Sequence, residues 1–423
     1  MAYLVVHRFF RDVHDESTKS LKIQGLVTLA TPVWSRLKTL RSLELINCEA
    51  NDLGPLSVLT GLETLICQRA LGIADISPLS ALRRMKLLDL NATNVSDLGP
   101  LSALTDLEIL DFSCTPACDM GPLSNLSGLH HLHIGHNVSS LSPLSILTRL
   151  ETLSFINSAT DLNPLSTLMR LRDLDIRYTA ASSLSPLSAM TGLRDLDIRY
   201  APVSNLSPLL ALTGMRHLDM CGISVDDLAQ HSAMTWLEAL DCRDIPAVFD
   251  LGPLSGPTRL HHLDFAFTEV SDLGPLSALT GLSYLVFSYT EVSDLGPLSA
   301  LTRLRYLDFS STDVSDLGPL SALTGLEELD CHNTYVNDLS LLSALTNLKK
   351  LHIDHIMDLS PIANLTMLDL HMQRRRRRRT KTREKWGRRW RRKRRSLRRE
   401  KMRRGVMPRR IFIGGIDHRK FIS

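Results

Sequence analysis

Leucines recur in a fixed arrangement along most of this chain, and that arrangement predicts its elements. In residues 304–326, Leu304, Leu307 and Phe309 follow a Leu-x-x-Leu-x-Leu pattern whose last part alternates apolar and polar positions. A period of two predicts a short strand that is buried on one face. Residues 316–320 follow as Asp-Leu-Gly-Pro-Leu, a run that is too short for a full helix. Because proline suits the first turn of a helical segment, we expect a short 3₁₀-like turn there.

The same text returns at a nearly constant interval, which indicates a repeat array. Thirteen of the 19 prolines lie 21 to 23 residues apart, except where a repeat keeps its leucines but loses the proline, around Gln230 and Leu341. A fixed period of this size predicts a solenoid, in which each repeat buries its apolar side only by stacking on its neighbours. These prolines are Pro55, Pro78, Pro100, Pro122, Pro143, Pro164, Pro186, Pro208, Pro253, Pro275, Pro297, Pro319 and Pro361.

One repeat carries a specific resemblance. Thr312, Val314, the pair 316–317 and the pair 319–320 stand where the leucine-rich repeat family places a turn residue, an aliphatic residue, Asp-Leu and Pro-Leu. The chain most resembles the 22-residue subclass of that family, found in bacterial internalins and in the regulatory subunit of protein phosphatase 1. The sequence of its repeats is also similar to that of leucine-rich repeat proteins of kinetoplastid protozoa. Threonine mostly replaces the usual turn asparagine, and its hydroxyl can still bond locally to the backbone.

The resemblance implies an α/β fold, a right-handed leucine-rich repeat solenoid. Its parallel β-sheet would line the concave side, and short 3₁₀ or irregular segments would form the convex side. The resemblance covers residues 40–371, in which we count sixteen strands. Residues 1–39 could supply an N-terminal helical cap, and residues 372–423 form a basic tail whose composition predicts disorder.

Charge is distributed very unevenly along the chain. The net charge is +4, but residues 374–410 hold 23 Lys or Arg and two Glu, a net of +21. Residues 1–373 hold 24 basic and 42 acidic side chains, a net of −18. The near-neutral total therefore describes neither the acidic body nor the basic tail.

The concave face is the predicted interaction surface. The middle residue of each Leu-x-Leu strand points onto that face, and it is acidic in eleven of sixteen repeats. Stacked like charges favour a basic partner, and neighbouring Arg and Tyr side chains are typical anchors of protein interfaces. The candidate residues are Asp175, Asp197, Asp219, Asp241, Asp264, Asp308, Asp330, Arg177, Arg199, Tyr178, Tyr200, Tyr284 and Tyr306. Other outward positions hold His217, Arg243, His262, Phe267 and Tyr289.

Two interpretations of this acidic row stay open. Selection for a protein partner would explain it, and the resemblance makes protein phosphatase 1 one such partner. Alternatively, gene duplication copied a solvated aspartate, as the near-identical stretches 171–178 and 193–200 suggest.

Three interpretations of residues 374–410 also stay open. Arginine-rich text with interleaved Trp386 and Trp390 is typical of nucleic-acid binding or of a nuclear-import signal. The segment could instead lie against the acidic face, or it could arise from a shifted reading frame in purine-rich DNA. The candidates for nucleic-acid binding or import are Arg374, Arg375, Arg376, Arg377, Arg378, Arg379, Arg391, Arg392, Lys393, Arg394 and Arg395.

The remaining chemistry argues against catalysis, cofactors and metals. A strand surface offers no cleft in which a nucleophile, a base and an oxyanion site converge. The seven cysteines show no CxxC pair, and Cys114 and Cys118 lack a second pair of ligands. No secretory signal and no run of 18 apolar residues is visible, so we expect no membrane partner and a cytoplasmic or nuclear location.

Overall fold

The computed structural model describes residues 19–24, 34–138, 140–156, 159–225, 234–245, 248, 250–256, 259–354, 358–365 and 368–373. Residues 1–372 form one compact unit and residues 373–423 a second. Residues 372 and 373 of the predicted tail belong to a strand (Asp369–Gln373), and the rest, with the candidate residues from Arg374 onward, lies outside the described residues.

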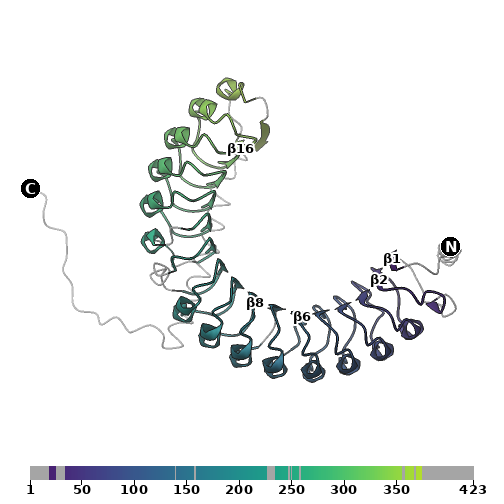
Figure 1. Cartoon of the computed structure of the whole chain (residues 1–423). Coiled ribbons are helices and arrows are strands. Elements are labelled where there is room, and N and C mark those ends of the chain that lie inside the picture. The colour runs from purple at the N-terminus through teal and green to yellow at the C-terminus, as the bar shows by residue number, and fades with distance from the viewer. Residues whose placement is uncertain are drawn as a thin grey trace, which may run out of the picture. The chain divides into compact units, whose positions relative to one another are not determined.

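The described strands form one sheet of 17 strands (Figure 1). Consecutive strands from β1 to β16 pair in parallel, as predicted. The strands are β1 (Ser20–Gln24), β2 (Ser42–Ile46), β3 (Thr64–Ile66), β4 (Leu87–Asp89), β5 (Ile109–Asp111), β6 (His131–Ile134), β7 (Thr152–Phe155), β8 (Asp173–Asp175), β9 (Asp195–Asp197), β10 (His217–Asp219), β11 (Ala239–Asp241), β12 (His262–Asp264), β13 (Tyr284–Val286), β14 (Tyr306–Asp308), β15 (Glu328–Asp330), β16 (Lys350–Asp354) and β17 (Asp369–Gln373).

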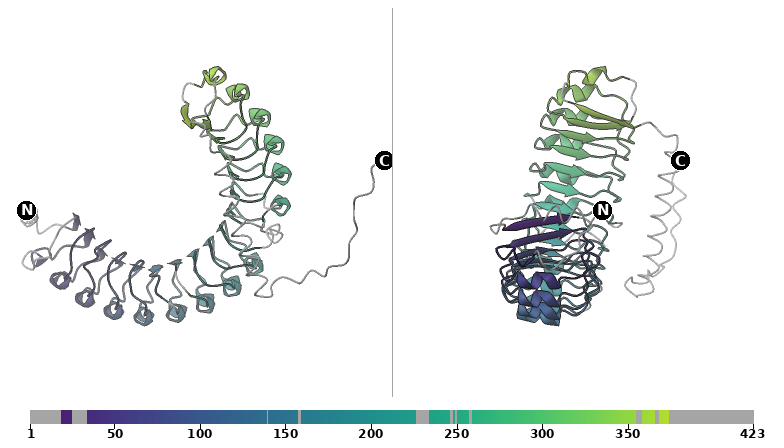
Figure 2. Two further views of the ribbon diagram at one scale, coloured as in Figure 1. Left: turned by 180° about the vertical axis from the view of Figure 1, so that it is seen from behind. Right: turned by 90° about the vertical axis from the view of Figure 1, so that its right-hand side faces the viewer.

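Short 3₁₀ turns alternate with the strands and lie on the opposite side of each coil (Figures 1 and 2). Each described turn except η14 has proline in its first positions, which confirms the predicted role of the prolines. The turns are η1 (Gly54–Val58), η2 (Ser77–Ala81), η3 (Gly99–Ala103), η4 (Gly121–Asn125), η5 (Ser142–Ile146), η6 (Asn163–Thr167), η7 (Ser185–Ala189), η8 (Ser207–Ala211), η10 (Gly252–Ser255), η11 (Gly274–Ala278), η12 (Gly296–Ala300), η13 (Gly318–Ala322), η14 (Ser340–Ala344) and η15 (Ser360–Ile362).

Identical register stacks the leucines of successive coils into one core. In β14 and β15, Leu307 pairs with Leu329, while Asp308 pairs with Asp330 on the outward face. Both leucines are buried, and both aspartates are half-buried. The alternation of the sequence therefore translates directly into a buried row and an outward row. The strands lie on the inner side of the arc formed within residues 1–372 (Figure 2). The row that points away from the core therefore lies on this inner surface, which we call the concave face.

A second set of aspartates organises the 3₁₀ turns. Before η13, the Asp316 carboxylate accepts the backbone N–H of Gly318 at 2.8 Å. Within the turn, the Ser321 hydroxyl donates to the Gly318 carbonyl at 2.7 Å. These bonds satisfy backbone and side-chain groups that a one-turn helix leaves open. The Asp-Leu-Gly-Pro-Leu-Ser segment thus forms a turn that is stabilised by hydrogen bonds among its own residues.

Threonine closes the loop after six of the described strands, as expected from its local bonding. The Thr312 hydroxyl is buried and donates to the Phe309 carbonyl at 2.7 Å. The residue before it, Ser311, has φ 61°, and its N–H donates to His332 of the next coil at 2.9 Å. The loop therefore combines a left-handed residue with a threonine that bonds to its own strand.

The N-terminal cap expected over residues 1–39 lies mostly outside the described residues, and the part that is described includes a strand. Residues 1–39 were expected to supply a helical cap, but Ser20–Gln24 form strand β1, which pairs in parallel with β2. Leu21 and Ile23 are buried and alternate with exposed residues, and this period of two favours a strand over a helix. The sheet therefore starts before residue 40 and has one strand more than the sixteen counted from the sequence.

Aromatic and sulfur side chains replace leucine at some core positions. Phe265, Phe287 and Phe309 stack in adjacent coils with ring centroids 5.7 and 5.9 Å apart. Three cysteines that stand at leucine positions are buried: Cys67, Cys242 and Cys331. Burial raises the pKa of all three thiols, which keeps them protonated.

Candidate functional site

The structure brings the predicted concave-face residues together on adjacent strands. Asp175 pairs in register with Asp197, which pairs with Asp219, and the row continues through Asp241 to Asp264. In the parallel row at the other end of the strands, Tyr284 pairs with Tyr306. Arg177, Arg199, Tyr178 and Tyr200 lie just beyond their strands, in the loops that leave the concave face.

The row aspartates also have a structural role that sequence reasoning missed. Each candidate aspartate accepts, through Oδ1, the backbone N–H of the residue two positions later, at distances from 2.8 Å for Asp308 to 3.2 Å for Asp330. Such a bond ends a strand by favouring a turn. The signal was present in the sequence, since the aspartate always precedes the loop. Folding alone would therefore preserve much of the row. The other acceptors are Asp175, Asp197, Asp219, Asp241 and Asp264.

Arginines neutralise part of the acidic row from within the chain. Arg199 Nε lies 3.0 Å from Asp197 Oδ1 and 3.1 Å from Asp219 Oδ2, so one guanidinium bridges two strands. Arg243 repeats the arrangement, with Nε 2.9 Å from Asp241 Oδ1 and 3.4 Å from Asp264 Oδ2. Between β8 and β12, the face is therefore an alternation of paired charges.

Burial changes the protonation of several row aspartates. Asp264 is 7% exposed, and burial, reinforced by the charge of Asp241, raises its pKa to about 7 despite the opposing effect of Arg243. Burial and the Asp241 charge likewise raise the pKa of Asp219 to about 6. Burial also raises the pKa of Asp175 and Asp308. Near neutral pH the concave face is consequently less negative than its sequence implies.

Aromatic rings gather on strands β12 to β14. His262, Tyr284 and Tyr306 form a continuous stack, with ring centroids 4.1 and 4.4 Å apart. Phe267 and Tyr289 stack at 4.5 Å in the loops beyond the same strands. Of these five residues, only Tyr284 and Tyr306 were among the candidates. The sequence already placed the other three at outward positions, and the register of the repeats predicts that residues one period apart lie side by side.

A further aromatic pair stands where the backbone is left-handed. Tyr178 and Tyr200 have φ values of 58° and 57°, and their rings stack at 4.9 Å. Bulky residues rarely adopt this conformation, which costs roughly 1–2 kcal/mol for a side chain with a Cβ. Both rings are well exposed, at 56% and 41%. The same left-handed conformation recurs in other coils, as at Ala92 and Asn333, so it belongs to the repeat, and the exposure of the two tyrosines is what makes their rings accessible.

Histidines and acids meet on the row that starts the strands β6 to β10. His131 Nδ1 lies 3.0 Å from the Thr152 hydroxyl, which donates to Asp173 Oδ2 at 3.3 Å. Burial, together with Asp195 in the next strand, raises the pKa of Asp173, and Asp195 itself pairs with His217. These contacts explain why imidazoles accompany the acids. Within the described ranges, no three His, Cys, Asp or Glu side chains form a group suited to a metal ion.

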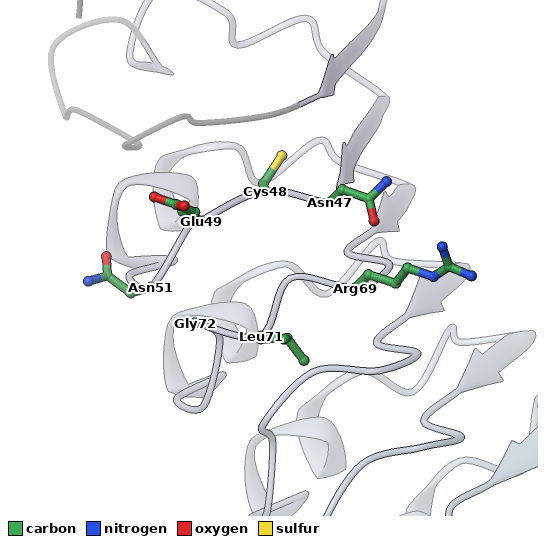
Figure 3. A pocket seen from close by; sticks show the side chains of 7 residues that line it. All are labelled: Asn47, Cys48, Glu49, Asn51, Arg69, Leu71 and Gly72. Carbon is green, nitrogen blue, oxygen red and sulfur yellow. The ribbon is translucent and has the colours of Figure 1, made fainter. Parts of the chain in front are cut away.

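One hollow lies away from the candidate residues, on the loops after β2 and β3 (Figure 3). Glu49 and Arg69 point in opposite directions there rather than toward a common centre. The arrangement therefore does not assemble a reactive set. Its lining is Asn47, Cys48, Glu49, Asn51, Arg69, Leu71 and Gly72.

Comparisons with known proteins address the fold. A family model described as "Leucine Rich repeats (2 copies)" matches residues 302–344. No curated protein matches the chain. Among the segments that the structure describes, no helix has the length and apolar character needed to cross a bilayer.

Three solved structures are similar to this chain. A leucine-rich repeat protein of Leptospira interrogans has a TM-score of 0.75 and 17% identity, covering 86% of this chain and 98% of that one. An internalin (inlF) of Listeria monocytogenes has a TM-score of 0.56 and 27% identity, covering 71% and 83%. The leucine-rich repeat ectodomain of the Arabidopsis thaliana receptor kinase GASSHO1/SCHENGEN3, in complex with CASPARIAN STRIP INTEGRITY FACTOR 2, has a TM-score of 0.58 and 18% identity, covering 84% and 53%.

Proposed function

Because the chain is a leucine-rich repeat protein, we propose that it is a non-enzymatic scaffold whose concave face binds a protein partner with a basic surface. The in-register rows of acidic and aromatic side chains on one face carry this proposal. Proteins of this fold generally serve in protein–protein interaction, and the similar plant ectodomain is in complex with its named factor.

The distribution of charge along the face supports a partner that makes mixed contacts. Paired arginines cover the aspartates between β8 and β12, where Arg177 also lies 3.1 Å from Asp175. Aromatic rings dominate the strands β12 to β14. Aromatic and arginine side chains are the usual energetic centres of protein interfaces, while flanking charges set orientation and association rate.

The test compares two triple variants of the full chain that lose the same charge from opposite sides. One carries Asp→Asn on the concave face at Asp197, Asp219 and Asp241, where asparagine keeps an oxygen to accept the turn N–H. The control carries Asp→Asn at Asp272, Asp294 and Asp316, which cap convex turns in the same manner.

Affinity purification followed by quantitative mass spectrometry gives the readout. We expect the wild type and the convex control to retain the same partners, and the concave variant to lose them by about tenfold or more. Equal retention by all three proteins would refute binding through this face. A protein phosphatase catalytic subunit among the retained partners would identify the more specific function suggested by the resemblance.

Two further expectations stay proposals that rest on the sequence. Nucleic-acid binding through residues 374–410 is an alternative function, supported by 23 basic residues in that segment. The second is a cytoplasmic or nuclear location, a reducing compartment in which the seven free cysteines would stay unpaired.

A further inference from the structure

One carboxylate of the row differs from its neighbours. Between β8 and β15, all row aspartates except Asp308 have an arginine or histidine of the same chain within ion-pair distance. Asp308 has none among the residues that the structure describes. Its contacts are with Ser310, whose backbone N–H donates to Oδ1 at 2.8 Å and whose hydroxyl also bonds to it.

The residue two positions after the aspartate explains this difference. At that position Arg177, Arg199 and Arg243 fold back onto the row, as the 3.0 Å contact of Arg199 Nε with Asp197 Oδ1 shows. In the Asp308 coil the position holds Ser310, which is too short to bring a positive charge to the carboxylate. Asp219 and Asp264 have Cys221 and Ala266 at that position, but each is reached by the arginine of the preceding coil. The coil that precedes Asp308 has Ser288 there, so neither coil supplies an arginine.

The surroundings of Asp308 are aromatic and apolar. Tyr306 starts the same strand and stacks on Tyr284 with ring centroids 4.4 Å apart. Val286, which is 6% exposed, replaces aspartate at the paired position of β13. Neighbouring rings and restricted water strengthen an ion pair with an incoming cation and favour contact with its aliphatic stem.

We propose that strands β13 and β14 take up an arginine side chain of the partner protein. The guanidinium pairs with Asp308, as the chain's own arginines pair with the other row aspartates, and the stem lies along Tyr306. This inference rests on the proposed function, which places the partner on the concave face, and it names the chemical group recognised there.

A labelled hexa-arginine peptide is the probe, and its binding to the full chain is measured by fluorescence anisotropy at physiological salt. Asp308→Asn removes the charge and keeps an acceptor for the Ser310 N–H. Asp111→Asn is the matched control, because Asp111 lies in the same row and accepts the Ser113 N–H at the same 2.8 Å. A hexa-citrulline peptide, which has the same shape without charge, controls for non-ionic binding.

We expect Asp308→Asn to weaken hexa-arginine binding about tenfold, since a charge-assisted bond to a half-buried carboxylate is lost. Asp111→Asn is expected to change it by less than about twofold. A second pair of variants guards against misfolding. Tyr306→Ala should weaken binding several-fold, whereas Ile109→Ala, at the same strand position beside Asp111, should not.

Equal weakening by Asp308→Asn and Asp111→Asn would show diffuse attraction and overturn the arginine site. Partner retention that depends on Asp197, Asp219 and Asp241 would then still support the proposed function, so the two failures are distinguishable. Binding that appears only after Arg374 to Arg379 are replaced by glutamine would also overturn the proposal, because the chain's own arginines would then occupy the site.

Discussion

Replacing Asp264 by asparagine tests how burial shapes the acidic row. Asp264 is 7% exposed and its pKa is raised to about 7, chiefly by burial. Asparagine keeps an oxygen that can accept the Ala266 N–H, which lies 3.0 Å from Oδ1. Arg243 keeps its other partner, Asp241. The substitution therefore removes mainly the charge.

The sign of the effect follows from proton linkage. The unfolded chain loses the proton near pH 3.9, whereas the folded chain keeps it until about pH 7. Between these values the native state binds more protons, so wild-type stability falls as pH rises. The resulting penalty on the free energy of unfolding is about 1.5 kcal/mol at pH 5 and about 4 kcal/mol at pH 8. Asp264→Asn removes the penalty at each pH, so the substitution should stabilise the protein by about 2.5 kcal/mol more at pH 8 than at pH 5.

Urea unfolding followed by circular dichroism at pH 5 and pH 8 measures this difference. The comparison between the two pH values cancels any constant cost of asparagine relative to a protonated aspartate. Asp75→Asn provides a control whose effect should be the same at both pH values, because hydrogen bonds from Ser77 lower the pKa of Asp75 and its carboxylate is charged in the folded and the unfolded chain at pH 5 and at pH 8. A destabilising effect of Asp264→Asn at pH 8, or an effect that is independent of pH, would refute the reasoning.

Two further substitutions test the stacks. Phe287→Ala removes the middle ring of the buried phenylalanine ladder and should lower the free energy of unfolding by about 3–5 kcal/mol in urea titrations, whereas a loss below about 1 kcal/mol would mean that the ladder relaxes freely. Gly222→Ala should cost about 1–2 kcal/mol, because Gly222 has φ 69° and an added Cβ would lie 2.4 Å from the Tyr200 ring. Gly192→Ala, whose Cβ would meet nothing closer than 3.4 Å, should leave the thermal midpoint and the near-ultraviolet tyrosine signal unchanged, and equal effects of both changes would contradict the steric argument.

The repetitive part of the fold was predictable from the sequence because local signals agree with one another there. Buried Leu307, Pro319 at the start of η13 and the Thr312 hydroxyl each do in the structure what their residue types predict. Strand β1 was not predicted, since its single Leu21–Ile23 alternation lies outside the proline period. A sequence period identifies the repeats that share the recurring positions, and it misses a repeat that has lost them.

The candidate site was only partly predictable. The sequence placed Asp264 and Asp308 in one row. It did not show that Arg243 pairs with Asp264, or that no cation among the described residues pairs with Asp308. Nor could it give the raised pKa of Asp264, which depends on burial by neighbouring coils. The sequence of each repeat determines which residues lie on the concave face, whereas the electrostatic environment of a residue depends on contacts between repeats.

The inter-strand hydrogen bonds described above have a mechanical consequence. Between the described coils they run along the direction of stacking, as from the Phe309 N–H to the Asp330 carbonyl of the next coil at 3.0 Å. Tension applied along the direction of stacking would therefore load the coils in series, like links of a chain, and each link would carry the whole force. The coil with the weakest interface would open first, while the others kept their shape. A stack built this way stretches in discrete steps, and its strength is that of one interface rather than the sum of all of them.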